Sequence, residues 1–180
     1  TPFAAQAFGV TPDIMTMAKA VTNGVVPLGA VASREKIYDT VLDASPMGAV
    51  EFFHGYTYSA IPVSMAAGLA MQDIIAKENL IQRSKDMSPY FLDGLFSLKD
   101  IDIVTDIRGY GMLGGIDIRI DERPGKAGYA CFKKLFEAGL SLKATGDCLI
   151  VAPPFISEKS HIDEIIEKLR KGITSYKKTL

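Results

Sequence analysis

The apolar residues of this chain recur with two different periods, and this alternation restricts the possible folds more than any other feature. Short apolar runs of strand length alternate with stretches whose apolar residues return every third or fourth position. The strand-like runs lie at 13–18, 28–32, 101–107, 112–120, 140–144 and 148–152. The helix-like stretches lie at 34–42, 62–75, 80–98, 128–138 and from 157 onward. An α/β chain in which helices cover sheets is therefore expected.

Local signals indicate where several of these helices begin and end. Ser33 is a typical N-cap for the first helix, and Pro62 suits the first turn of the second. The pair Ser88-Pro89 predicts a kink or a break in the third, and Gly139 is a typical stop for the fourth. The last helix carries its apolar residues in one stripe, formed by Ile162, Ile165, Ile166, Leu169 and Ile173.

The order of these segments predicts two units. Residues 1–90 are expected to form an α/β sheet domain, and residues 91–180 a smaller α+β domain. Apolar residues make up 48% of the chain and charged residues 23%, which is enough for a sizeable core. The chain begins at Thr1 without a methionine, so we expect it to be a piece of a longer protein, with a processed protein as the alternative.

Several classes of function are disfavoured by composition. The net charge of −1 does not suit a nucleic-acid partner, and no apolar run has the length of a membrane span. The two cysteines, Cys131 and Cys148, lie far apart, and only two histidines are present, so we expect no metal site. Unpaired cysteines favour a reducing, cytoplasmic location.

Lys19 is the first candidate functional residue, because it directly follows the apolar run at 13–18. A strand end lies at the edge of a sheet, where ligand sites of α/β proteins form. An amine partly removed from water holds its proton less tightly, and imine chemistry needs a neutral amine. An ordinary solvated lysine would suit the same position.

The segment from His54 to Ser59 is the second candidate. Gly55 allows close approach of a ligand to the backbone, and Thr57 and Ser59 place hydroxyl groups just before a predicted helix. A helix N-terminus with hydroxyl groups attracts a phosphate. A simple N-capping loop would contain the same residues, so this alternative stays open.

Arg108 is the third candidate, within the glycine-rich segment from Asp106 to Gly111. Its planar guanidinium suits two-point binding of a carboxylate. A surface ion pair with Asp106 is the alternative.

Together, the order and spacing of these segments resemble the class III (ω-type) pyridoxal-phosphate-dependent aminotransferases. Residues 11–24 with 27–31 are similar to the lysine motif of that family, and residues 52–59 to its phosphate-contacting loop. Residues 106–115 resemble its carboxylate-binding arginine segment. Through 52–59 and 145–154 the chain is most similar to the β-alanine (ω-amino acid):pyruvate aminotransferases, and the resemblance extends to about residue 171.

The resemblance implies a fold and a set of roles. Residues 1–90 would be the C-terminal part of a fold-type I PLP-transferase large domain, and residues 91–180 the small C-terminal domain. Lys19 would form the Schiff base with pyridoxal 5′-phosphate and then carry the transferred proton. Tyr56 and Thr57 would contact the cofactor, with Thr57 reaching the phosphate of the neighbouring subunit in a homodimer or homotetramer. Arg108 would bind the carboxylate of pyruvate and swing aside for a donor that lacks one.

Two features depart from the family pattern. Ile61 stands before Pro62 where the family usually has histidine. The acidic residue for the pyridine nitrogen, the aromatic residue that stacks on the ring and a Gly/Ser phosphate loop precede the lysine motif in the family and are not among these residues. The acidic residue matters because it keeps the pyridine nitrogen protonated, which makes the ring an electron sink. The chain thus corresponds to the C-terminal part of a family member, less than half of its length.

We therefore expect an aminotransferase that moves an amino group from an ω-amino acid or amine to pyruvate. One alternative is a catalytically inactive fragment or remnant that serves only in folding or association. A second alternative is a PLP-dependent aminomutase.

Overall fold

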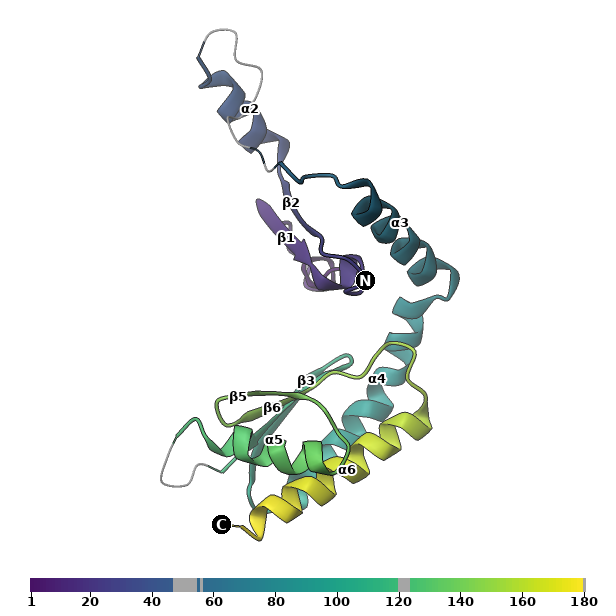
Figure 1. Ribbon diagram of the computed structural model, residues 1–180, viewed down its shortest axis with the longest axis vertical. Helices are drawn as coiled ribbons and strands as arrows, with labels where there is room; N and C mark the ends of the chain where they lie inside the picture. Colours follow the sequence, from purple (N-terminus) through teal and green to yellow (C-terminus); the bar gives the residue numbers. More distant parts are fainter. Residues whose placement is uncertain (47–54, 56, 120–123, 180) are drawn as a thin grey trace. The chain divides into compact units, whose positions relative to one another are not determined.

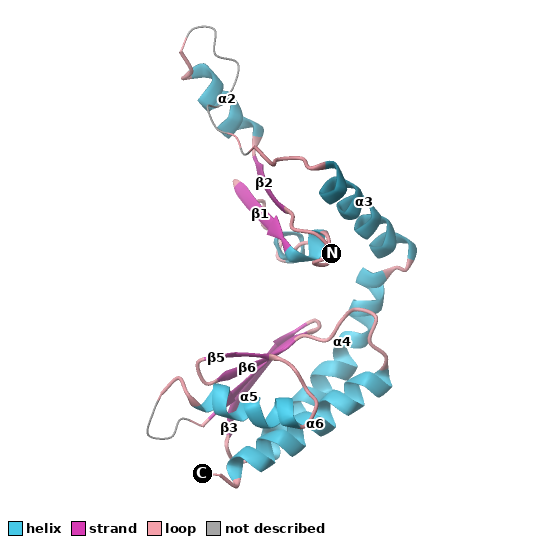
Figure 2. Cartoon of the chain, viewed as in Figure 1, coloured by secondary structure: helices cyan, strands magenta, loops and turns pink. Residues whose placement is uncertain are grey.

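A computed structural model describes residues 1–46, 55, 57–119 and 124–179 of the chain. Its internal contacts divide the chain into two compact units, Thr1–Asn79 and Leu80–Leu180. Figures 1 and 2 show the elements of each unit. The sequence placed the boundary near residue 90, which lies inside the helix that opens the second unit.

The first unit contains one hairpin and a few helices. Strands β1 (Ile14–Ala18) and β2 (Gly29–Ser33) pair antiparallel, in a register that runs from Ile14↔Ser33 to Ala18↔Gly29. The helical elements are α1 (Ala4–Ala7), the 3-10 turn η1 (Lys19–Val21), α2 (Glu35–Asp43) and α3 (Pro62–Lys77). Both predicted strands of this unit are therefore present, and Pro62 occupies the first turn of α3 as expected.

The described part of the first unit has no buried hydrophobic side chain. Its buried residues are Thr22, Ser64 and Gly68. The expectation that β1 is a buried strand was wrong for this chain, since its residues are exposed or half-buried. The physical reason is that β1 has β2 as its one neighbour in a two-stranded sheet, which leaves both faces uncovered.

Helix α2 begins one residue later than its sequence signal indicated. Ser33 is the last residue of β2 and pairs with Ile14, so it is held in the strand ladder. The N-cap is Arg34, which has extended backbone angles and makes no side-chain cap bond. Its guanidinium instead donates to the carbonyl of Thr11 at 2.7 Å and lies 3.3 Å from Asp13.

The second unit is a sheet covered by helices on one face (Figure 1). Its four strands are antiparallel in the order β3-β4-β6-β5. The strands are β3 (Val104–Tyr110), β4 (Leu113–Ile118), β5 (Lys143–Thr145) and β6 (Cys148–Val151). The helices are α4 (Leu80–Phe96), the 3-10 turn η2 (Ser97–Asp100), α5 (Ala127–Glu137) and α6 (Lys159–Lys177). The sequence placed all of these strands and α-helices correctly to within a few residues.

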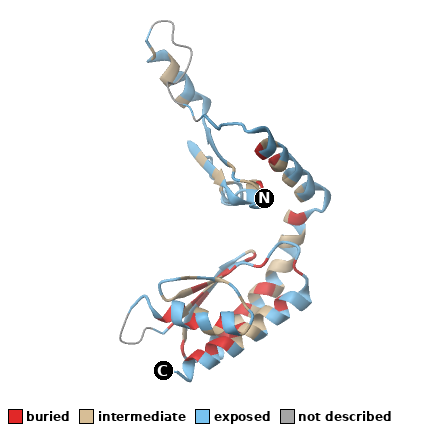
Figure 3. Cartoon of the chain, viewed as in Figure 1, coloured by how far each residue is buried: buried red, intermediate tan, exposed pale blue. Residues whose placement is uncertain are grey.

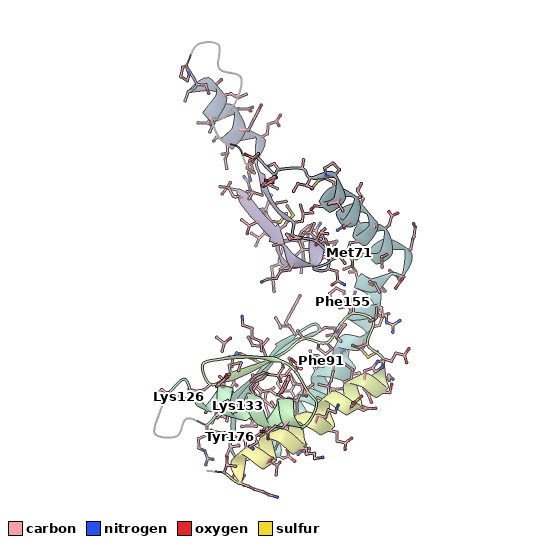
Figure 4. All side chains as sticks on the ribbon, in the orientation of Figure 1. Met71, Phe91, Lys126, Lys133, Phe155 and Tyr176 are labelled. Atoms are coloured by element: carbon pink, nitrogen blue, oxygen red, sulfur yellow. The ribbon has the colours of Figure 1, made fainter. Side chains whose placement is uncertain are left out.

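A hydrophobic core fills the space between this sheet and its helices, as the concentration of buried residues in Figure 3 shows. Phe91 projects from α4 toward the sheet (Figure 4), with its ring 3.5 Å from where a Cβ on Gly114 would lie. The predicted stripe of α6 is confirmed, because Ile162, Leu169 and Ile173 are fully buried.

Helix α4 continues through Pro89, so the expected break is not present. Pro89 has no amide hydrogen, which leaves the carbonyl of Lys85 without its helical donor. Both residues are exposed, and water can bond this carbonyl.

The start of α5 is fixed by a residue from the β5–β6 turn. Asp147 accepts hydrogen bonds from the backbone amides of Gly125 at 2.7 Å and Ala127 at 2.9 Å. A Cβ on Gly128 would collide with the backbone oxygen of Gly146, so the helix lies directly against this turn.

Within the described residues, no helix has the length and apolar character needed to cross a bilayer. No group of three or more metal-ligating side chains occurs in the same part of the chain.

Candidate active site

Lys19 lies where the hairpin ends and the chain turns away from the sheet. Ala18 forms the last pair of the β1–β2 ladder, and Lys19 opens the turn η1. Its φ of 57° is in the left-handed region, which costs about 1 kcal/mol or more for a residue with a side chain. Such strain is concentrated at functional sites. The side chain is exposed within this chain, so the first unit alone does not provide the desolvation expected for Lys19.

Lys19 lines an open cavity of about 690 Å³, which is in the size range of small-molecule sites. One wall is the segment that follows Lys19, and another is the turn that leads into α3. The lining residues are Lys19, Thr22, Gly24, Val26, Pro27, Leu28, Gly29, Tyr58, Ser59, Ala60, Ile61, Ser64 and Met65. No acidic side chain is among these residues.

The N-terminus of α3 contributes the second functional feature of this cavity. Its N-cap is Ile61, and no side chain caps the helix end. A helix of 16 residues carries a partial positive charge at this end, which favours a bound anion. Ser59, on the turn before the helix, adds a hydroxyl group to the same cavity. Ala60 has a φ of 55°, so this turn is also strained.

Two buried hydroxyl groups hold the wall that follows Lys19. Thr22 donates to the carbonyl of Val26 at 2.7 Å, and Ser64 of α3 donates to the carbonyl of Pro27 at 3.0 Å. Sequence reasoning assigned no role to either hydroxyl. A buried serine among small residues was the available signal, but its partner 37 positions away could not be read from the sequence.

Of the two hydroxyl residues predicted in the phosphate loop, the structure places one in the cavity of Lys19. Ser59 lines the lysine cavity, whereas Thr57 is exposed on the same turn and is not among the lining residues. His54 and Tyr56 lie outside the described residues. The predicted cofactor contacts of Tyr56 and Thr57 therefore stay predictions.

Arg108 belongs to the second unit, on the face of the sheet that no helix of that unit covers. It pairs with Gly115 across β3 and β4, and a Cβ on Gly115 would approach its side chain at 3.7 Å. Its guanidinium donates to Asp117 through Nη1 at 2.7 Å and through Nη2 at 3.1 Å. Nη1 also donates to Asp106 at 2.8 Å, which is the ion pair that the sequence left open as an alternative.

These ion pairs shift the acidity of the groups involved. Hydrogen bonds from Arg108 lower the pKa of Asp117 below its usual value, and hydrogen bonds to Asp117 and Asp106 raise the pKa of Arg108. Burial raises the pKa of Cys148, which lies within 3.5 Å of Nη2. Sequence reasoning missed Asp117, because its place opposite Arg108 depends on strand register.

The arrangement in the first unit fits part of a pyridoxal-phosphate site. The amine of Lys19 can react with an aldehyde, and the N-terminus of α3 with Ser59 can attract a phosphate. The cavity has no described carboxylate that could pair with the pyridine nitrogen. The residues present therefore fit the two ends of the cofactor and leave the ring nitrogen without a partner.

A family model for class III aminotransferases matches residues 1–173. The chain belongs to this family. The resemblance that rested on the lysine, phosphate-loop and arginine segments is thereby confirmed.

The relatives of the chain include an omega-aminotransferase and a beta-alanine–pyruvate aminotransferase. An omega-aminotransferase of Caulobacter vibrioides is 43% identical over 173 residues, which cover 94% of this chain and 39% of the relative. A beta-alanine–pyruvate aminotransferase of Pseudomonas aeruginosa is 43% identical, with 94% of this chain and 38% of the relative covered. The chain thus spans about two fifths of the length of the curated relatives it matches.

Solved structures of the family share its fold. The omega transaminase of Pseudomonas jessenii in complex with PMP has a TM-score of 0.91 at 25% identity, covering 99% of this chain and 41% of that one. An omega-transaminase of Thermomicrobium roseum has a TM-score of 0.87 at 31% identity, covering 98% of this chain and 40% of that one. The expected fold, part of a fold-type I large domain followed by a small α+β domain, is therefore confirmed.

Proposed function

We propose that this chain is the lysine-bearing part of an ω-amino acid:pyruvate aminotransferase. Two relatives that are 43% identical carry the names omega-aminotransferase and beta-alanine–pyruvate aminotransferase, and this supports the donor and acceptor class. The observation that carries the proposal is the cavity that Lys19 shares with the uncapped N-terminus of α3.

The proposed cofactor is pyridoxal 5′-phosphate, which when bound supplies an aldehyde for amines and a ring that withdraws electrons. Lys19 holds the aldehyde end with its amine. When it is not bound to the aldehyde, the amine of Lys19 would take the proton from the amine-bearing carbon of the substrate and hold it for transfer. The N-terminus of α3 and the hydroxyl of Ser59 bind the phosphate end.

The proposed carboxylate-binding role of Arg108 carries a condition. Both of its terminal nitrogens are bonded to Asp117, and one is also bonded to Asp106. A substrate carboxylate that binds Nη1 of Arg108 therefore has to replace an existing acidic partner.

The proposed working form is a homodimer or a larger assembly. The exposed hydroxyl of Thr57 supports this proposal, because a residue that serves the phosphate of a neighbouring subunit has to be accessible from outside its own unit.

Covalent labelling tests the proposal. The protein is incubated with pyridoxal phosphate, reduced with borohydride, and its modified peptides are identified by mass. The expected product is a phosphopyridoxyl group on Lys19, with Lys36 of α2 as an exposed lysine that stays unmodified. Labelling spread over surface lysines would contradict the proposal and favour the inactive remnant.

Turnover then tests the substrate class. Amino transfer from β-alanine to pyruvate is expected, and Lys19→Arg should reduce it by about 100-fold or more because the proton carrier is lost. Lys36→Arg is the matched control and should leave the rate unchanged. Isomerisation of an amino acid without consumption of pyruvate would instead identify an aminomutase.

A further inference from the structure

We infer that Ser64 is a positioning residue that sets the separation between Lys19 and the N-terminus of α3. This inference rests on the proposed function, because it concerns how the two ends of the lysine cavity are held in place. Ser64 lies in the first turn of α3 and is 5% exposed. Nothing in the proposed chemistry requires its hydroxyl to touch the cofactor.

The hydrogen bond of Ser64 differs from the other hydroxyl bonds of its unit. It joins Ser64 to the carbonyl of Pro27, 37 positions earlier, at 3.0 Å. Thr22, Thr40 and Ser45 each donate to a carbonyl four positions away, within a single turn or helix. Among the described residues of this unit, the Ser64 hydroxyl is thus the one that ties two separate segments together.

A second contact on the same face of α3 supports this role. Gly68 follows Ser64 by one helical turn, and a Cβ placed there would lie 3.3 Å from Cδ2 of Leu28 and 3.8 Å from the carbonyl of Val21. The absence of a side chain at Gly68 lets α3 lie close to the segment that follows Lys19. The close approach and the hydrogen bond act at adjacent turns of the same helix.

The tied segment is the wall of the cavity that begins at Lys19. Within it, Thr22 fixes the carbonyl of Val26, and the next carbonyl, that of Pro27, accepts from Ser64. The wall is therefore internally braced by Thr22 and attached to α3 by Ser64. Loss of the Ser64 hydroxyl would free α3 to shift relative to Lys19 while leaving the wall itself intact.

Such a shift should weaken the binding of a ligand that contacts both Lys19 and the N-terminus of α3 more than the binding of a ligand that contacts Lys19 alone. Pyridoxal phosphate would engage Lys19 through its aldehyde and α3 through its phosphate at the same time. Pyridoxal, which has no phosphate, would engage Lys19 alone. A positioning role for Ser64 therefore predicts a loss of the preference for pyridoxal phosphate over pyridoxal.

The experiment measures the dissociation constants of both ligands by their absorbance with the native protein and with Ser64→Ala. The loss of one hydrogen bond is expected to reduce the preference for pyridoxal phosphate on the order of five-fold. Pyridoxal itself should bind Ser64→Ala about as well as the native protein. Ser64→Thr, which restores a hydroxyl, should restore the preference.

Ser45→Ala is the matched control, because Ser45, just after the C-terminus of α2, makes a half-buried hydrogen bond of 3.0 Å to the carbonyl of Val41 and does not line the cavity. It should leave both dissociation constants unchanged. Equal weakening of both ligands by Ser64→Ala, or no weakening, would overturn the positioning role. A native protein without any preference for the phosphate form would instead overturn the proposed phosphate site, so the two failures are distinguishable.

Discussion

The two units of this chain differ in how they are stabilised. The second unit has a continuous core in which Phe91, Leu95 and Leu169 are fully buried. The first unit buries no hydrophobic side chain among its described residues, and its helix α3 exposes Val63 at 61% and Leu69 at 71%. An isolated two-stranded hairpin is at best marginally stable in water.

The candidate chemistry lies in the unit that has no hydrophobic core of its own among its described residues. Lys19 and Ser64 both belong to the unit without a core. A helix that is apolar on several sides is typical of one that is covered in the working protein. The precision of the lysine cavity must therefore depend on contacts that the first unit does not make with itself.

Separating the two units should distinguish them most clearly. Residues 80–180 expressed alone should unfold in one cooperative transition, because they share one buried hydrophobic core. Residues 1–79 alone should show no cooperative transition, because they bury too little apolar surface to offset the entropy of ordering the chain. Circular dichroism during urea titration measures both. A cooperative transition in residues 1–79 would contradict the conclusion that the first unit cannot stabilise itself.

A matched pair of leucine truncations comes next. Leu95→Ala in α4 should cost about 2–5 kcal/mol of unfolding free energy, because it leaves a cavity in the core. Leu69→Ala in α3 should change stability by less than about 0.5 kcal/mol if its surface is open. Hydrogen exchange of amides in each unit measures the effects. A cost at Leu69 close to that at Leu95 would show that another polypeptide covers α3.

A matched pair of glycine substitutions has a smaller effect. A Cβ on Gly114 would collide with Leu95, so Gly114→Ala should destabilise the second unit by about 1–3 kcal/mol. No described atom lies within 4 Å of such a Cβ on Gly55, so Gly55→Ala should be nearly neutral. Urea unfolding of the whole protein compares them. Equal losses of unfolding free energy in the two variants would show that β4 and α4 can move apart to accept the extra methyl group.

The ion pairs of Arg108 with Asp106 and Asp117 should make the unfolding free energy depend on pH, with a smaller effect. Arg108 lowers the pKa of folded Asp117 below its unfolded value of about 3.9. The stabilisation of the folded state by this ion pair is therefore complete above that pH. The contribution is lost as pH falls through the lower, folded pKa. Asp117→Asn should remove this acid sensitivity and cost about 0.5–1 kcal/mol at pH 7, since the pair is partly exposed.

The first unit offers a control for this pH dependence. Arg34 and Asp13 form an ion pair whose side chains are 49% and 76% exposed, so Asp13→Asn should change stability by a few tenths of a kcal/mol at most, roughly the lower limit for surface pairs. Unfolding free energies measured from pH 2 to 7 test both variants. An Asp117→Asn curve parallel to that of the native protein would refute the role of Arg108.

Backbone strain gives effects similar in size to those of the ion pairs. Ala60 adopts a φ of 55°, so Ala60→Gly should stabilise the first unit by about 0.5 kcal/mol, the difference between the relieved strain and the added freedom of the unfolded chain. Gly146 has a φ of 59° in the second unit, so Gly146→Ala should destabilise it by about 1 kcal/mol. Hydrogen exchange resolves the two units. A stabilising Gly146→Ala would contradict the argument.

Elements governed by local signals were predictable from the sequence. Pro62 and Gly139 mark helix boundaries through their own backbone chemistry, and the stripe of α6 follows from helical geometry. Ser33 was a misleading signal because the β1–β2 ladder uses the same residue. Pro89 was misleading because exposed carbonyls tolerate a missing donor.

The candidate site was predictable only where a motif identified a residue by its own chemistry. Lys19 was found in this way. Ser64 and Asp117 were not, because their roles depend on partners that tertiary packing and strand register bring to them. The burial expected for β1 also failed, since burial depends on neighbours that this unit lacks.

The carboxylate of Asp147 links the amide of Ala127, the first residue of α5, and that of Gly125 just before it to the β5–β6 turn. A helix end held by its own residues can fray without disturbing the rest of a domain. The first turn of α5 cannot open in this way unless the turn that carries Asp147 also moves. The amide of Ala127 should therefore exchange with deuterium only in openings that include the hairpin, so that it reports on the second unit as a whole.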